Sequence, residues 1–280
     1  MDIVGNISPQ DYDRFKLFLE QACGILLGEG KQYLITSRLT KLLRDEKIPS
    51  VSALLQAIEL RQPRHLRDAV IDAMTTNETS WFRDQSPFEI LAQEVFPEMD
   101  GSGKRQCRIW SSACSSGQEP YTISIALSEY MAKVAASGLV NTQIVATDIS
   151  MSMLAKAKQA EYDEGVLGRG LTVERKQQFF TPIGERWRVA DQIIRRVSFN
   201  EQNLLSTYGA LGKFDIIFCR NVLIYFSAER KTDILNRMAL ALNPGGYLFL
   251  GASETISGYT DAFEMIRSAH GVFYRLKTKP

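Results

Sequence analysis

A loop of small residues after the apolar run Arg108–Ser112 is the part of this chain that best suits a bound ligand. Ala113, Ser115 and Gly117 occupy alternate positions of that loop, so the backbone can pass close to a bound molecule. Asp148 closes the next apolar run, where a carboxylate at a strand end could accept both hydroxyls of a ribose. This spacing predicts a nucleoside-containing ligand.

The glycine content of the same loop narrows the choice of ligand. A dinucleotide site usually carries Gly-x-Gly-x-x-Gly, whereas this loop contains Gly117 alone. S-adenosylmethionine has no phosphate, so the loop would need only to pass its methionine part closely, with Asp148 on the ribose. The turn Asn243–Gly246 also resembles the class I methyltransferase fold, whose final strand pair runs antiparallel.

Helical patterns fill the first part of the chain, residues 1–75. A helix start at Ser8–Asp11, a second helix over about 31–46 and a third between Pro49 and Pro63 predict an all-helical N-terminal domain. A linker is expected over 76–90, and a further helix from Ser86 is expected to end at Pro97.

Strands and helices alternate in residues 91–280, which predicts an α/β domain. We expect a doubly wound, mainly parallel sheet that binds its ligand at the carboxyl ends of its strands. Between 159 and 203 the alternation breaks down into a glycine-containing loop and two short strands within Trp187–Phe199, which predicts an inserted β-subdomain. The strand candidates of the sheet itself are Arg108–Ser112, Gln143–Thr147, Phe214–Cys219, Tyr247–Leu250 and Gly271–Lys277.

Composition excludes several classes of protein. The chain has 280 residues, and its formal net charge of +1 gives no global field for nucleic acid. Four cysteines without a Cys-x-x-Cys pair and only two histidines predict neither a zinc site nor a disulfide framework. Residues 1–6 lack the features of a signal peptide, and no apolar run approaches the roughly 20 residues that span a bilayer. We expect a cytoplasmic protein without membrane insertion.

Five stretches in this order resemble one family over essentially the whole chain, the CheR chemoreceptor glutamate methyltransferases. The resemblance implies a Rossmann-like class I methyltransferase sheet with an all-helical N-terminal domain and a small inserted β-subdomain. It also implies methyl transfer from S-adenosylmethionine to glutamates of chemoreceptors, with S-adenosylhomocysteine as product. The stretches are Thr75–Arg83, Trp110–Tyr121, Ala146–Asp148, Gln202–Leu205 and Cys219–Phe226.

The same resemblance implies the residues of the site. Arg83 would lie near the cofactor carboxylate and the reaction centre, and Tyr225 beside the transferred methyl; these are the expected catalytic residues. The expected cofactor-binding residues are Asn77, Thr79, Arg83, Ala113, Gly117, Glu119, Asp148, Asn203, Leu204, Arg220 and Asn221.

Simpler structural roles are open for several of these residues. Asn77 and Thr79 could form a helix cap, and Glu119 could be an acid placed favourably at a helix N-terminus. Asp148 could cap a solvated helix. Tyr225 could be one aromatic residue on an apolar face.

A basic ridge is the candidate for partner binding. Arg38, Lys41 and Arg44 fall close in angle on the helix over 31–47, opposite its leucines. Such a face is often only solvated, but in the family this helix faces the acidic helical bundle of the receptor. The inserted β-subdomain could also pair with an extended C-terminal receptor peptide, as in some relatives.

Two rival functions share the predicted fold. A methyltransferase acting on RNA or on a small molecule is the nearest, because a fold does not determine its substrate. The sequence Asn221–Tyr225 in place of Asn-Pro-Pro-Tyr argues against methylation of an exocyclic amine on a base. A regulator that binds S-adenosylmethionine without catalysis is the other rival, and the presence of both Arg83 and Tyr225 argues against it.

Overall fold

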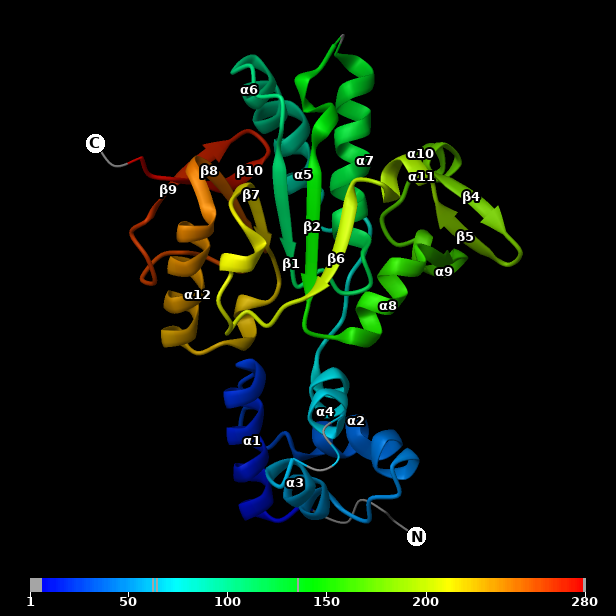
Figure 1. The fold of residues 1–280 in the computed structure, drawn as a ribbon, viewed down its shortest axis with the longest axis vertical. Helices are drawn as coiled ribbons and strands as arrows, with labels where there is room; N and C mark the ends of the chain where they lie inside the picture. Colours follow the sequence, from blue (N-terminus) through cyan, green and yellow to red (C-terminus); the bar gives the residue numbers. More distant parts are fainter. Residues whose placement is uncertain (1–6, 62, 64, 135, 279–280) are drawn as a thin grey trace.

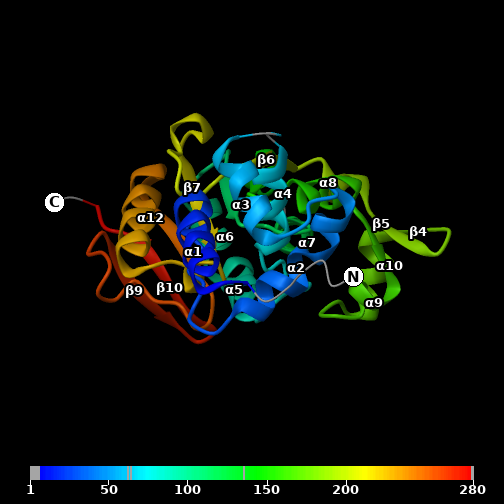
Figure 2. The same ribbon diagram turned by 90° about the horizontal axis from the view of Figure 1, so that it is seen from below.

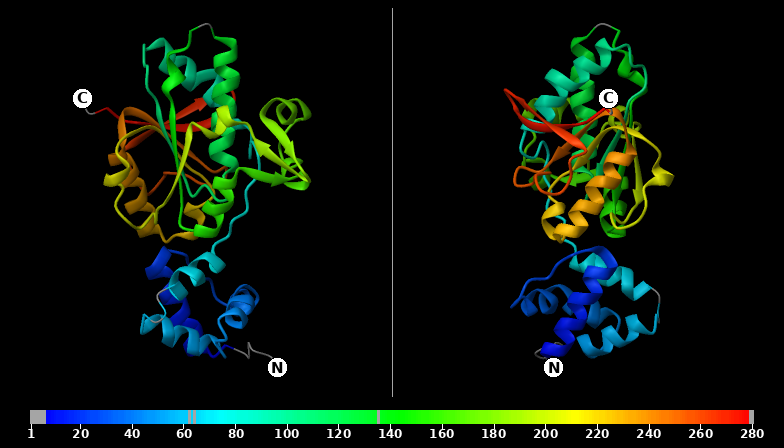
Figure 3. Two further views of the ribbon diagram at one scale, coloured as in Figure 1. Left: turned by 45° about the vertical axis from the view of Figure 1, so that its right-hand side comes forward. Right: turned by 90° about the vertical axis from the view of Figure 1, so that its left-hand side faces the viewer.

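The computed structural model describes residues 7–61, 63, 65–134 and 136–278, and its N-terminal helices form a lobe of their own (Figures 1 and 3). Ser8 caps the first helix by accepting the N–H of Asp11 at 3.1 Å, as the sequence predicted. Apolar faces of all the lobe's helices meet in one core that includes Phe15, Leu39 and Leu54. The helices are α1 (Pro9–Cys23), α2 (Gln32–Asp45), α3 (Val51–Glu59) and α4 (His65–Met74).

A segment of irregular backbone, residues 75–85, connects this lobe to the rest of the chain. Helix α5 (Ser86–Ile90) begins within the range expected as a linker. The predicted helix end at Pro97 is wrong, because a π-helical turn, η1 (Leu91–Val95), leads into α6 (Phe96–Gly101). Pro97 therefore occupies the first turn of α6, where its missing N–H is tolerated.

The large sheet has the predicted doubly wound order, β6-β2-β1-β7-β8-β10-β9. Neighbours from β6 to β8 are parallel, whereas β10 is antiparallel to both β8 and β9. Every residue of β7 is buried, as expected for a strand covered on both faces. The strands are β1 (Arg108–Ser112), β2 (Gln143–Asp148), β6 (Val197–Glu201), β7 (Phe214–Cys219), β8 (Leu242–Leu250), β9 (Phe263–Ser268) and β10 (Gly271–Leu276).

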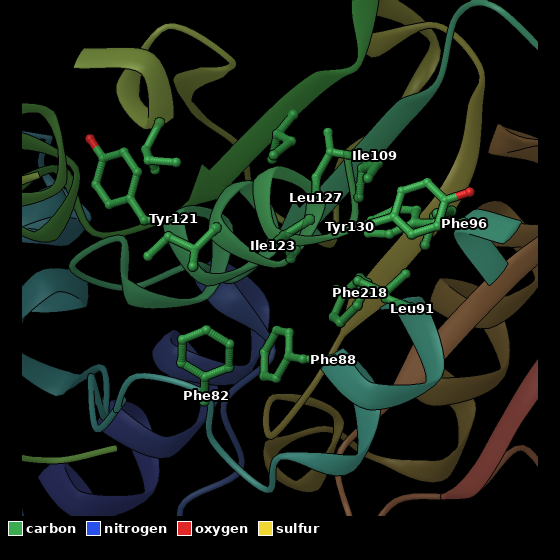
Figure 4. Packing of buried hydrophobic residues seen from close by; sticks show 14 of the residues in the cluster. Phe82, Phe88, Leu91, Phe96, Ile109, Tyr121, Ile123, Leu127, Tyr130 and Phe218 are labelled. Atoms are coloured by element: carbon green, nitrogen blue, oxygen red, sulfur yellow. The ribbon is translucent and has the colours of Figure 1, made fainter. Parts of the chain in front are cut away.

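Helices cover both faces of this sheet. Helices α5, η1, α6 and α7 (Gln118–Lys133) form one layer, whose side chains share a core with the sheet; Phe88, Ile123 and Phe218 lie within it (Figure 4). Helix α12 (Ala228–Ala241) packs on the other face, and α8 (Met151–Gln159) lies beside β2 and β6. Single 3-10 turns complete the connections: η2 (Gly138–Asn141), η3 (Gly209–Leu211) and η4 (Leu223–Tyr225).

The predicted insertion is present as a small antiparallel sheet, in the order β3-β5-β4, that projects beside α7 and α8 (Figure 1). One expectation about it is wrong: the second short strand predicted there, β6, pairs with β2 in the large sheet. An alternating pattern reports a half-buried strand but not the sheet to which it belongs. The insertion contains β3 (Glu161–Asp163), α9 (Glu164–Leu167), α10 (Val173–Phe179), β4 (Phe180–Ile183), β5 (Arg186–Val189) and α11 (Asp191–Ile194).

The helical lobe contacts the carboxyl-terminal edge of the sheet, in front of which it lies when seen from below (Figure 2). The side chain of Asn203 donates to the carbonyl of Ala22 at 2.8 Å, and Ser150 donates to the carboxylate of Asp72. Gly24, with φ of 78°, leaves room for the ring of Phe226, because a Cβ atom there would lie 2.3 Å from that ring. Within the described residues, no helix is both long and apolar enough to cross a membrane.

Candidate cofactor site

A cavity, partly open to solvent, lies between the helical lobe and the carboxyl ends of β1, β2 and β7. The expected site residues meet there, with one exception: Gly117 does not line the cavity. Those that line it are Asn77, Thr79, Arg83, Ala113, Glu119, Asp148, Asn203, Leu204, Arg220, Asn221 and Tyr225.

The loop after β1 runs close to the cavity because its backbone alternates into the left-handed region. Ala113 has φ of 57° and Ser115 has φ of 50°, values that are uncommon for residues other than glycine. Two bonds to β2 hold this conformation: Cys114 donates to the carbonyl of Thr147 at 2.9 Å, and Ser115 donates to Asp148 at 2.7 Å. The small residues predicted that the backbone of this loop passes close to a ligand, and hydrogen bonds to β2 hold the loop in that course.

Gly117, which does not line the cavity, has a packing role at the start of α7. It has φ of 93° and begins α7. A Cβ atom at this position would lie 2.9 Å from the Cβ of Ala157 and 3.1 Å from the hydroxyl of Tyr162. The residue is small because α8 and β3 approach the loop closely at this point.

Asp148 is held as a buried acceptor at the end of β2. One carboxylate oxygen accepts the N–H of Ser115, and the other accepts the N–H of Ser150 at 2.8 Å. Burial raises the pKa of Asp148, and these backbone N–H groups act in the opposite direction. Because each oxygen keeps a second lone pair, the carboxylate can also accept the two hydroxyls of a ribose.

Glu119 lines the cavity, but its carboxylate is already paired. Ser111 donates to one oxygen at 2.7 Å, and the guanidinium of Arg220 donates to the other at 3.0 Å. Burial raises the pKa of Glu119, and the positive charge of Arg220 opposes that shift. The helix-terminal role weighed from the sequence and a place in the cavity are therefore both realised at this residue.

Arg220 connects the end of β7 to the segment that carries Arg83. Its side chain is only 1% exposed, and it bonds the carboxylate of Asp84 at 2.7 Å and the carbonyl of Arg83 at 2.8 Å. Phe82, Asp84 and Gln85 all have positive φ, so this segment is a tight, strained turn. Arg220 thus fixes the backbone from which Arg83 extends.

Arg83 itself is half-buried at the cavity. Its guanidinium donates to the carbonyl of Glu78 at 2.9 Å, and it forms no ion pair with any other described side chain. A cation whose remaining donors lack a protein partner fits the carboxylate of a methionine-derived cofactor.

Asn203 and Tyr225 attach the helical lobe to the cavity wall. The side-chain amide of Asn203 bonds at both ends: it donates to Ala22 and accepts the N–H of Leu205 at 2.9 Å. Tyr225 ends the turn η4, and its carbonyl accepts the N–H of Leu26 at 2.9 Å. Both residues line the cavity, so these contacts with the lobe lie at the cavity wall.

Sequence reasoning missed the lining residues that come from the helical lobe. Cys23, Ile25 and Met74 line the cavity although they precede the Rossmann-like domain in the chain. The only local signal is Gly24, which ends α1 with its left-handed backbone. Glu254, which accepts backbone N–H groups of the loop after β7, was also missed.

Of the expected basic ridge on α2, Arg38 is directed at the cavity wall. It donates to the carbonyls of Met74 and Thr75 and, at 2.9 Å, to the hydroxyl of Thr76. Lys41 and Arg44 are exposed. Two cations of the ridge are therefore exposed, and the third, Arg38, is half-buried and bonds the segment that lines the cavity.

Potential metal ligands do not gather in the part of the chain that the structure describes. No group of three or more His, Cys, Asp or Glu side chains there could hold a metal ion. All four cysteines are buried free thiols.

The strand order, the antiparallel β10 and an acidic residue at the end of β2 together define a Rossmann-like class I methyltransferase fold. The family model described as "CheR methyltransferase, SAM binding domain" matches residues 77–272, and "CheR methyltransferase, all-alpha domain" matches residues 10–75. The chain belongs to the CheR methyltransferase family, and its cofactor is S-adenosylmethionine.

Full-length relatives agree with this assignment. The chain is 52% identical over 270 residues to "Chemotaxis protein methyltransferase Cher2" of Pseudomonas putida, covering 95% of this chain and 98% of that protein. It is 52% identical over 269 residues to "Chemotaxis protein methyltransferase 1" of Pseudomonas aeruginosa, covering 95% of this chain and 98% of that protein. A "Chemotaxis protein methyltransferase" of Vibrio parahaemolyticus is 52% identical over 273 residues, covering 97% and 98% respectively.

Proposed function

We propose that this methyltransferase converts glutamate side chains of chemoreceptors to γ-glutamyl methyl esters. The cavity between lobe and sheet carries this proposal, since it combines the ribose acceptor Asp148, the cation Arg83 and the aromatic Tyr225. The names of the relatives, chemotaxis protein methyltransferases, support receptors as the substrate class.

Orientation and exclusion of water are the tasks left to the protein's own residues. Bound S-adenosylmethionine supplies a methyl group on a positively charged sulfur. A substrate glutamate, with an ordinary pKa of about 4.3, is already ionised at neutral pH, so no general base is required. Arg83 orients the cofactor, Tyr225 borders the reacting atoms, and the helical lobe keeps water from the carboxylate.

Receptor docking involves two surfaces in this proposal. Lys41 and Arg44 are exposed on α2 and would steer an acidic helical bundle toward the lobe. Strand β4 is an edge of the small sheet, with β5 as its paired neighbour, so an extended C-terminal receptor peptide could add to it as a further strand. Pull-down with such a peptide at micromolar concentration tests the second surface, and no retention contradicts it.

Intact-mass analysis tests the substrate class directly. Cytoplasmic receptor fragments, incubated with the protein and S-adenosylmethionine, should gain methyl groups that mild base removes, because methyl esters hydrolyse readily. RNA treated in parallel should gain none. Base-stable methylation, or methyl transfer to RNA alone, contradicts the proposal.

The variant Arg83→Ala tests the assignment of the site. We expect turnover to fall on the order of 100-fold, because the cofactor is no longer held in line with the glutamate. The free energy of unfolding should change by less than about 1 kcal/mol, since only one hydrogen bond of a half-buried side chain is lost. Unchanged turnover contradicts the role of Arg83.

A further inference from the structure

We propose that Glu254 is a positioning residue for methyl transfer, which sets the loop carrying Asn221 and Tyr225 at the edge of the cavity. Glu254 lies beyond β8, in a connection that the sequence does not mark as part of any site. It does not line the cavity. Any effect on catalysis must therefore pass through the loop it holds.

The contacts of Glu254 converge on backbone groups. One carboxylate oxygen accepts the N–H of Asn221 and the N–H of Gly251, each at 2.7 Å. The other accepts the N–H of Val222 at 3.0 Å and the N–H of Ile224 at 3.3 Å. The side chain forms no ion pair with any described cation, so its charge is satisfied by these donors.

The loop needs such an acceptor because of its conformation. Asn221 lies two residues beyond the end of β7 and has φ of 58°, so the chain leaves the sheet in a left-handed turn. The N–H groups of Tyr225 and Phe226 have partners within the turn, the carbonyls of Val222 and Leu223. The N–H groups of Asn221, Val222 and Ile224 donate to Glu254. A carboxylate binds N–H donors more strongly than a neutral acceptor does.

Gly251 leaves the space that the carboxylate of Glu254 occupies. A Cβ atom on Gly251 would lie 2.7 Å from the Oε2 atom of Glu254 and 2.9 Å from the backbone nitrogen of Asn221. Only glycine at this position lets β8 and the β7 loop close around one carboxylate. Glu254 thus connects the ends of two parallel strands at the edge where the cavity lies.

The variant Glu254→Gln probes this role. An amide offers one oxygen acceptor and turns an NH₂ group toward backbone donors, so part of the loop loses its partner. We expect amides of residues 221–224 to exchange with deuterium ~10-fold faster or more, while the helical lobe is unchanged. At saturating cofactor and receptor, kcat should fall on the order of 10- to 100-fold, with a smaller change in KM for the cofactor.

Two further variants separate positioning from general stability. Glu254→Asp keeps the charge on a shorter side chain and should recover part of the lost kcat. Asp261→Asn neutralises an exposed carboxylate in the same β8–β9 connection and should leave both kcat and loop exchange as in the wild type. In the double variant with Tyr225→Phe, the two losses of kcat should be less than multiplicative, because one residue acts through the other.

The kinetic measurements rest on the proposed function, whereas deuterium exchange does not depend on the receptor. Wild-type protein that transfers no methyl to receptors refutes the proposed function and leaves the exchange result to decide on Glu254. Wild-type exchange and kcat in Glu254→Gln, or fully multiplicative losses in the double variant, overturn the positioning role. If Glu254→Gln does not fold, Glu254→Asp decides: kcat and exchange equal to wild type overturn the role.

Discussion

The backbone N–H of Leu26 donates to the carbonyl of Tyr225 at 2.9 Å, which joins the helical lobe to the loop expected beside the transferred methyl. A second bond between lobe and sheet, from Asn203 to Ala22, lies at the same cavity. We therefore expect the lobe to be coupled to the candidate cofactor site, so that loss of either contact weakens cofactor binding.

Asn203→Ala tests this coupling. The carbonyl of Ala22 and the N–H of Leu205 both lose their partner, which should lower the free energy of unfolding by about 1–3 kcal/mol. Calorimetry should also show ~10-fold weaker binding of S-adenosylhomocysteine, equivalent to about 1.4 kcal/mol. Asn200→Ala, on the exposed side of β6, serves as the control and should change neither quantity. Normal affinity in Asn203→Ala contradicts the coupling.

Substitutions of the α2 cations should affect two different steps, binding of the cofactor and binding of the receptor. Arg38→Ala frees the carbonyls of Met74 and Thr75 at the cavity wall, so we expect a higher KM for S-adenosylmethionine. Lys41→Ala and Arg44→Ala should instead weaken receptor binding in a salt-dependent manner and leave cofactor affinity unchanged. Steady-state kinetics with each substrate varied in turn separates the two effects. The same kinetic pattern in all three variants speaks against this division.

Much of the fold could be predicted because its signals are local. Ser8 predicts the start of α1, and the mainly apolar run Phe214–Cys219 predicts a central strand. Strand β9 was missed because its exposed positions interrupt the apolar pattern of an edge strand. The sheet to which β6 belongs depends on pairing with β2, a contact distant in sequence.

Some residues of the candidate site could likewise be predicted from local sequence, whereas others depend on contacts distant in the chain. Residues on recognisable stretches, such as Asp148 and Arg83, line the cavity as expected. Side-chain partners could not be predicted, because they depend on tertiary contacts. The charge of Arg38 suggested a surface, but its guanidinium turns inward to the end of α4. Nothing near Glu254 in the chain indicates that it holds a loop more than 25 residues away.

Removal of Arg220 should destabilise the fold around the cavity. Arg220→Ala leaves the carboxylate of Glu119 without its cation and the carbonyl of Arg83 without a donor. We expect a loss of about 3 kcal/mol in the free energy of unfolding, measured by urea denaturation. Arg188→Ala, which removes the exposed pair with Asp191, should cost less than about 1 kcal/mol. Equal losses in the two variants contradict the structural importance of Arg220.

Cofactor affinity should depend on pH through Asp148. Burial raises the pKa of this carboxyl above its ordinary value of 3.8, whereas ribose hydroxyls donate to its ionised form. Binding therefore lowers the pKa, and affinity should weaken as the pH falls through the raised value. Folding of the protein without cofactor should depend on pH in the opposite sense. The buried charge of Asp148 does not lower the free energy of unfolding below the ordinary pKa, and lowers it fully above the raised pKa.

Titration of S-adenosylhomocysteine in two buffers of different ionisation enthalpy measures this linkage. Protons should be released on binding within the acidic range between the lowered and the raised pKa of Asp148. Asp148→Asn, which cannot ionise, should bind more weakly and release none of these protons. Proton release that persists in the variant assigns the effect to another group.

Calorimetric titration of the folded wild-type protein and Asp148→Ala with S-adenosylhomocysteine, at neutral pH, tests the central claim most directly. We predict one molecule bound per wild-type chain. Binding by the variant should be at least ~10-fold weaker, because the ribose hydroxyls of S-adenosylhomocysteine lose their acceptor. No binding by the wild type, or equal binding by both proteins, would contradict the assignment of this cavity as the methyl-donor site.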